Sequence, residues 1–160
     1  MSGRAIVSWA CALGLLLSSV AEARLPSAVL GKAFFTVERI KDADTDALAK
    51  LFVKAKPRIE LERGKDKRWK ATLVAFFRKA PADGPMTLWL YDKEDKASLK
   101  AKEPVHVFSI DNVKPKQVFI YDLDIDPDRG FNKNHTYLVF IGQIFGKRHQ
   151  HYAKGEVALK

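Results

Sequence analysis

The sequence WKATLVAFFR, residues 69–78, decides the fold class of this chain. Its odd-numbered positions from Trp69 to Phe77 are all apolar, and Val74 and Phe76 are apolar on the other side. A period of two indicates a β-strand, and a strand that is apolar on both faces lies between neighbours or under a covering element. We therefore expect residues 69–78 to form a central strand of a sheet.

The same two-residue period recurs from Lys56 onward, with turn residues between the segments. This pattern is typical of an antiparallel sandwich or barrel. An earlier apolar segment, residues 32–40, is expected to pair at a sheet edge. The predicted fold is all-β, a seven- to eight-stranded antiparallel β-sandwich. Its expected strands are 32–40, 58–62, 69–78, 86–92, 105–110, 117–125, 136–145 and 150–159.

One short helix is expected near residues 45–55. Asp44 or Thr45 is placed to cap it by accepting a backbone N–H bond. The residue before a proline is disfavoured in the helical region, so Pro57 ends the helix. Its expected apolar face, at helical spacing, consists of Ala47, Leu48, Leu51, Phe52 and Ala55.

Residues 1–23 have the pattern of a signal peptide. Arg4 precedes an apolar run over 5–17, and residues 21–23 are a small-x-small site, so cleavage is expected before Arg24. An uncleaved N-terminal anchor is the alternative. The only cysteine, Cys11, lies within this segment. The mature chain, 24–160, is then a single cysteine-free domain without a transmembrane segment, exported to the periplasm or secreted.

Two aromatic residues carry a resemblance to a known architecture. Tyr137 follows GFNKNHT, residues 130–136, and lies just inside the penultimate expected strand. Trp89 lies in the third strand of the series that starts at residue 58. With their strand order, residues 58–159 resemble an immunoglobulin-like or fibronectin type III-like sandwich, which often has a tyrosine corner and a buried tryptophan there. The resemblance implies architecture and no activity. A jelly roll or a calcium-binding sandwich of the C2 type has a similar pattern.

The basic residues predict a binding surface. The chain carries 28 Lys and Arg against 19 Asp and Glu, a formal net charge of +9. Alternate connections of a sandwich lie at opposite ends, and one end has basic residues opposed only by Asp83 and Asp111. We expect an exported, non-catalytic module that docks an anionic envelope polymer or an acidic protein there, and no specific nucleic acid. The predicted docking residues are Arg78, Lys79, Lys114, Lys116, Lys147 and Arg148.

Two further functions remain open from the sequence. The acidic residues Asp122, Asp124, Asp126 and Asp128 gather near the end of an expected strand, where hard oxygen ligands favour calcium. The same side chains also suit a solvated strand face that discourages aggregation. A calcium-dependent binding module is thus one alternative. The other is an envelope structural subunit that assembles through an edge strand.

Catalysis is not expected. The serines after residue 23 lie outside any nucleophile elbow, and the glycines form no phosphate-binding loop. His149 and His151 share one face of the last expected strand, but a zinc site needs a third ligand. His135 is expected about seven residues away along that strand, roughly 23 Å. His106 belongs to another strand. No cofactor is predicted besides the possible calcium, and the sequence does not define an oligomeric state.

Overall fold

The computed structural model describes residues 25–40, 44–111, 113 and 116–160. The expected signal peptide and Lys114 lie outside the described residues. Neither α-helix in the described part of the chain has the length and apolar character needed to cross a bilayer. In chain order the elements are β1 (Lys32–Thr36), α1 (Thr45–Phe52), β2 (Arg58–Leu61), β3 (Trp69–Phe76), β4 (Met86–Asp92), α2 (Lys96–Ala101), β5 (His106–Ile110), β6 (Val118–Ile125), η1 (Pro127–Arg129), β7 (Thr136–Phe145) and β8 (Arg148–Leu159).

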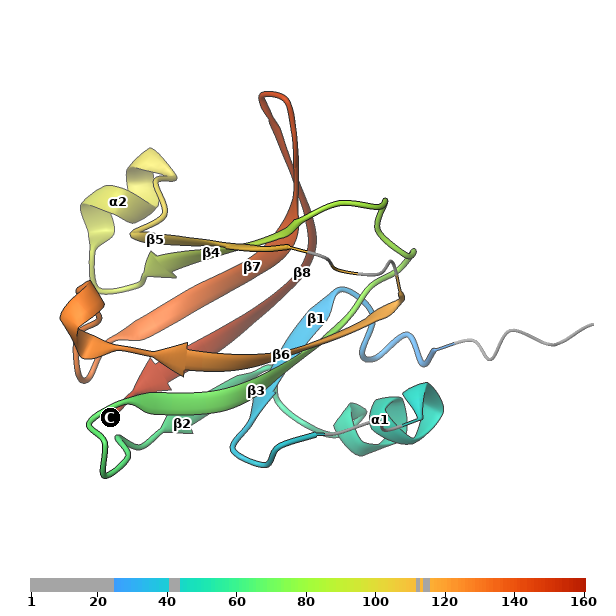
Figure 1. Ribbon diagram of the computed structural model, residues 1–160, viewed down its shortest axis with the longest axis horizontal. Helices are drawn as coiled ribbons and strands as arrows, with labels where there is room; N and C mark the ends of the chain where they lie inside the picture. The colour runs from blue at the N-terminus through green and yellow to red at the C-terminus, as the bar shows by residue number, and fades with distance from the viewer. Residues whose placement is uncertain (1–24, 41–43, 112, 114–115) are drawn as a thin grey trace, which may run out of the picture.

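The eight strands form one curled sheet, in the order β5-β4-β7-β8-β1-β3-β6, with β2 also paired to β8. In Figure 1 the sheet folds over, so that β4 and β5 lie above β3 and β6. The all-β class and the short helix expected near residue 45 are confirmed. Of the resemblance to immunoglobulin-like domains, the β-rich, curled architecture is what the structure supports.

The expected antiparallel pairing needs correction. β1 and β2 both run parallel to β8, with Lys32 opposite Lys154 and Arg58 opposite Glu156, so the sheet is mixed. β1 is also not an edge strand, since it lies between β3 and β8. Ala33, Phe34 and Phe35 are all buried, so side chains cover both faces of β1. Such a strand is typical of the interior of a sheet and not of its edge.

The main core fills the inside of the curl. The inward face of β3 packs there with side chains of β4, β7 and β8, as the alternation over 69–78 predicts. Trp69 is 1% exposed, and its indole N–H donates to the carbonyl oxygen of Lys160 at 2.9 Å. This bond holds the chain end against the start of β3.

A second core explains why β3 is apolar on both faces. α1 lies on the side of β3 that faces away from β4 (Figure 1), and its Phe52 ring packs against Phe34 and Phe76. The Asp44 carboxylate caps the helix by accepting from the Ala47 N–H. Three residues expected on the buried face, Ala47, Leu51 and Ala55, are instead exposed, Leu51 at 65%. The buried face consists of Leu48, Ala49 and Phe52.

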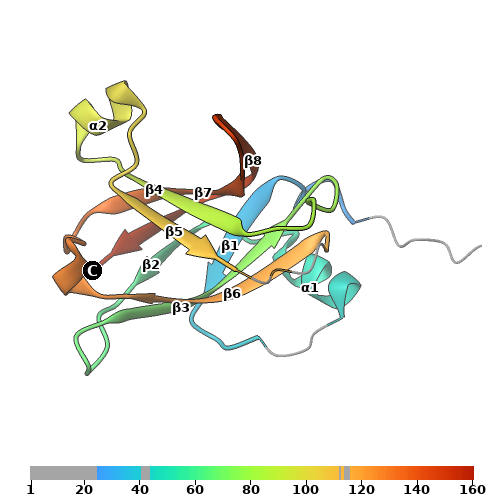
Figure 2. The same ribbon diagram turned by 45° about the horizontal axis from the view of Figure 1, so that its top comes forward.

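Two local features depart from the expected elements. α2 was not predicted, since its residues 96–101 include no buried side chain and therefore no apolar stripe. β7 and β8 form a long hairpin that projects clear of the sheet in both views (Figures 1 and 2). Its register shifts at Ile141 and Gly142, which pair with Ala153 and His151 and leave Tyr152 as the extra residue of a β-bulge.

Candidate anion-binding site

The predicted docking residues lie on three connections of the sheet. Arg78 and Lys79 follow β3, Lys116 precedes β6, and Lys147 and Arg148 lie at the turn of the β7–β8 hairpin. All five are exposed. Lys114 lies outside the described residues, so the structure places five of the six predicted residues.

Hydrogen bonds hold two of these connections side by side. The Phe77 N–H donates to the carbonyl oxygen of Gln117 at 2.8 Å, and the Gln117 side chain donates to the carbonyl oxygen of Arg78 at 3.4 Å. The segment after β3 therefore lies next to the segment before β6, which carries Lys116.

The β3–β4 connection is also joined to the base of the hairpin. The Gln143 amide donates to the carbonyl oxygen of Ala82 at 2.8 Å, and the Tyr152 hydroxyl donates to the Gln143 side-chain oxygen at 2.9 Å. Gln143 is only 3% exposed, so these bonds are part of the buried structure. They fix the base of the hairpin near Arg78, whereas Lys147 and Arg148 lie at its far end.

A surface hollow of about 360 Å³ lies where β1, β8 and the end of β3 meet. We call it the basic hollow. Lys32, Arg78 and Lys154 reach it from these three segments, and no acidic residue lines it in the described part of the chain. All three cationic side chains are exposed. Its lining residues are Leu30, Gly31, Lys32, Arg78, Phe140, His151, Tyr152, Ala153 and Lys154.

Three aromatic residues, Phe140, His151 and Tyr152, are among those that line the basic hollow. The His151 and Phe140 rings are 4.8 Å apart between centroids, and Tyr152 packs against Phe77 at 5.6 Å. His151 and His149 also cover Trp89, at 4.9 Å and 5.3 Å. Burial against these rings lowers the pKa of His151, and the nearby His149 lowers it further. The imidazole of His151 therefore stays neutral at pH 7.

The four acidic residues proposed for calcium do not converge. Asp122 pairs with Arg39 at 3.1 Å, and Asp124 pairs with Arg68 at 3.0 Å. Asp126 also contacts Arg68, at 3.2 Å, and its second oxygen accepts from the backbone N–H of Asp128. Asp122 and Asp124 lie two residues apart along β6, opposite Thr72 and Lys70. Three of the four carboxylates are thus already engaged by arginine.

Two of the three cations of the basic hollow were not predicted from the sequence. The predicted docking residues were sought in loops, but Lys32 and Lys154 lie on strands, and they meet only because β1 runs parallel to β8. The outward position of Lys154 in the alternating final strand was the one available signal. Nothing local indicates that a strand near residue 32 pairs with one near residue 154. Comparison with family models, curated proteins and solved structures finds no significant match.

Proposed function

We propose that this protein is an exported, non-catalytic binding module that docks an anionic polymer on the basic hollow. The observation that carries this proposal is the convergence of Lys32, Arg78 and Lys154 on one hollow without an acidic lining residue. A surface hollow lined by charge of one sign raises the local concentration of counter-charged ligand and speeds its association. The chain's net charge of +9 acts in the same direction at longer range.

An acidic polysaccharide is the partner we favour over an acidic protein. Phe140 and His151 line the hollow next to the cations, and a sugar ring stacks on aromatic rings through its C–H bonds. Pockets of this kind combine an apolar wall with a few charged groups that set orientation. The carboxylate or phosphate groups of the polymer would then meet Arg78, whose planar guanidinium binds either group with two hydrogen bonds.

The exposed hairpin extends this surface. Lys147 and Arg148 lie beyond the basic hollow, at the tip of β7–β8, and both are exposed. Exposed charges of this kind mainly steer a partner during approach and contribute less to the affinity of the complex. We therefore propose that the hairpin tip and Lys116 attract the polymer as it approaches. The basic hollow then holds the bound polymer.

The finer fold assignment is also a proposal. In an immunoglobulin-like sandwich, strands A, B and E are neighbours in one layer, and C, F and G in the other. Here β1, β3 and β6 are neighbours, and so are β4, β7 and β8, which supports that correspondence. The Tyr137 hydroxyl accepts from the Asn132 N–H at 2.9 Å, as in a tyrosine corner. Trp89 departs from the pattern, because it packs under His149 and His151 and not within the main core.

Export rests on the sequence of residues 1–23, and the anionic envelope polymers are partners that an exported protein meets.

The two alternative functions, a calcium-dependent module and an envelope structural subunit, have less support. The carboxylates of the calcium alternative contact Arg39 and Arg68. Assembly through an edge would use β2, β5 or β6, each of which pairs with one other strand of the described sheet.

A binding panel tests the proposal. The protein is titrated at low salt with polygalacturonate, with dextran sulfate and with polyglutamate, and neutral dextran is the control. We expect saturable binding to the acidic polysaccharides that weakens as salt screens the charges, and no binding to dextran. Tighter binding to polyglutamate would move the partner to the class of acidic proteins. No binding to any polyanion would refute the function.

A further inference from the structure

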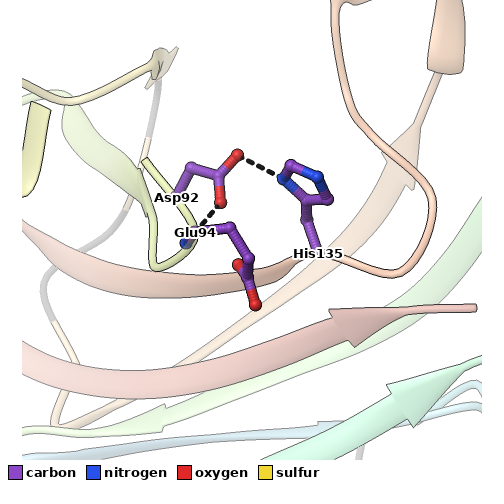
Figure 3. Close-up of side chains that lie close together, drawn as sticks. All are labelled: Asp92, Glu94 and His135. Carbon is purple, nitrogen blue, oxygen red and sulfur yellow. Dashed lines mark hydrogen bonds and ion pairs between the residues drawn. The ribbon is translucent and has the colours of Figure 1, made fainter. Parts of the chain in front are cut away.

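A group of three potential metal ligands lies away from the basic hollow, where β4 ends and β7 begins. Asp92 is the last residue of β4, and Glu94 lies two residues after it. His135 directly precedes β7. The strands are neighbours, with Asp92 opposite Tyr137, so the three side chains meet (Figure 3). One donor atom from each lies within 4.8 Å of the other two.

Backbone groups already orient these side chains. One oxygen of Asp92, Oδ1, accepts from the Glu94 N–H at 3.0 Å, and one oxygen of Glu94, Oε2, accepts from the Thr136 N–H at 2.9 Å. Asp92 Oδ2 contacts His135 Nδ1 at 2.7 Å. Glu94 Oε1 is thus left for a ligand, whereas both oxygens of Asp92 are engaged, Oδ2 by the His135 ring. Such outer hydrogen bonds hold metal-binding side chains in place.

Two carboxylates and one imidazole leave this group with an excess of negative charge. The Asp92 side chain is only 6% exposed, and a buried carboxylate is costly unless an opposite charge lies beside it. In the described part of the chain, neither Asp92 nor Glu94 forms an ion pair with Lys or Arg, although the protein is strongly basic. The neighbouring Lys93 pairs with Glu156 instead. Within the described residues, the His135 imidazole, which is cationic only when protonated, is the one ion-pair partner of Asp92.

We propose that Asp92, Glu94 and His135 bind a zinc ion. One imidazole and two carboxylates are a donor set that Zn²⁺ accepts, whereas Ca²⁺ requires six to eight oxygen ligands. His135 Nδ1 and Asp92 Oδ2 would separate from 2.7 Å to about 3.3 Å to admit the ion between them, at the usual zinc–ligand distances. Access is open, since Glu94 is exposed and the His135 side chain is 33% exposed.

Three protein ligands leave a fourth tetrahedral position for water or a ligand atom. The ion would neutralise Asp92 and tie the turn after β4 to the start of β7. This site is independent of the basic hollow, since none of its three residues lines that hollow. The sequence did not reveal it, because His135 was weighed only against the other histidines, and Asp92 lies far from it along the chain.

Zinc titration of the chelator-treated protein tests the proposal by calorimetry, with cobalt(II) absorption as a second readout of four-coordinate geometry. The informative variants are Glu94→Gln and His135→Gln. Asp92 is left unchanged because its buried carboxylate is part of the local fold. His149→Gln and Glu103→Gln are the matched controls, since they remove an exposed histidine and an exposed glutamate elsewhere.

We expect one zinc ion per protein, an affinity that falls more than tenfold in Glu94→Gln and in His135→Gln, and unchanged binding in both controls. Absence of zinc binding by the unsubstituted protein would overturn the proposal. So would binding that survives both informative variants, or binding lost in His149→Gln, which would place the ion at the hairpin. Because Glu94 is exposed, its variant reports on the site without depending on the core.

Discussion

The imidazole of His151 packs on the ring of Phe140, with 4.8 Å between centroids, while it also lines the basic hollow. The same ring lies at 4.9 Å from Trp89, which is only 1% exposed. One histidine therefore covers a buried tryptophan on the outer face of the sheet and faces the cations Lys32, Arg78 and Lys154.

This position makes anion binding depend on pH. Burial lowers the pKa of His151, so the ring is neutral at pH 7 and becomes cationic only below its ordinary value of 6.5. A proton on His151 adds positive charge to a hollow without acidic lining, so anion binding strengthens as the pH falls from 7 to 5. Dextran sulfate is the suitable probe, because its sulfates stay charged throughout. His151→Gln should flatten the pH profile, and an unchanged profile would contradict this role.

The Tyr137 hydroxyl predicts a measurable contribution to stability. It accepts a hydrogen bond from the Asn132 N–H, and Tyr137 is 1% exposed. Tyr137→Phe keeps the ring and removes the acceptor, so the free energy of unfolding should fall by about 1 kcal/mol. Urea unfolding followed by tryptophan fluorescence measures the change. An unchanged urea midpoint would mean that the hydrogen bond between Asn132 and Tyr137 does not stabilise the loop before β7.

Gly155 is predicted to be required where β8 passes β1. A Cβ there would overlap the backbone carbonyl of Ala33 and approach Phe35 to 3.0 Å. Gly155→Ala should destabilise the fold by about 3 kcal/mol, because two backbones must separate. Gly146→Ala is the control. It has φ +60 with no atom within 4 Å, so it should cost about 1 kcal/mol of left-handed strain. Equal costs in urea unfolding would refute the close approach of β8 to β1.

Calcium should leave the stability unchanged. The Arg68 guanidinium contacts both Asp124 and Asp126, and Arg39 contacts Asp122. A calcium ion would have to displace these arginines and then gather carboxylates that lie on β6 and on the turn after it. We therefore expect the same Tm with added calcium and with chelator. A Tm that rises with calcium would restore the calcium-dependent alternative.

The sequence predicted those parts of the structure that local patterns determine. Alternation over residues 69–78 predicted a central strand with a covered second face, and Asp44 predicted the start of α1. The helix ends at Phe52, earlier than Pro57 predicted. The parallel contacts of β1 and β2 with β8 were missed, because they join segments that are distant in the chain and that no turn connects.

The sites were harder to predict for the same reason. Arg78 was identified from its loop, but its partners Lys32 and Lys154 needed the sheet order. The group of Asp92, Glu94 and His135 needed the pairing of β4 with β7. Local patterns indicate which residues are available for chemistry, whereas the long-range register decides which of them meet.

Charge reversal tests whether the basic hollow is the surface that binds the anionic polymer. Arg78→Glu with Lys154→Glu places two acidic side chains at the basic hollow. Lys65→Glu with Lys67→Glu makes the same change of net charge in the exposed loop before β3. Binding of polygalacturonate at low salt is measured for both variants, and their amide NMR spectra verify the fold. We expect a loss of more than tenfold in affinity for the first variant, about 1.4 kcal/mol, and less than twofold for the second. Equal losses would contradict the proposal, because binding would then follow net charge and not the hollow.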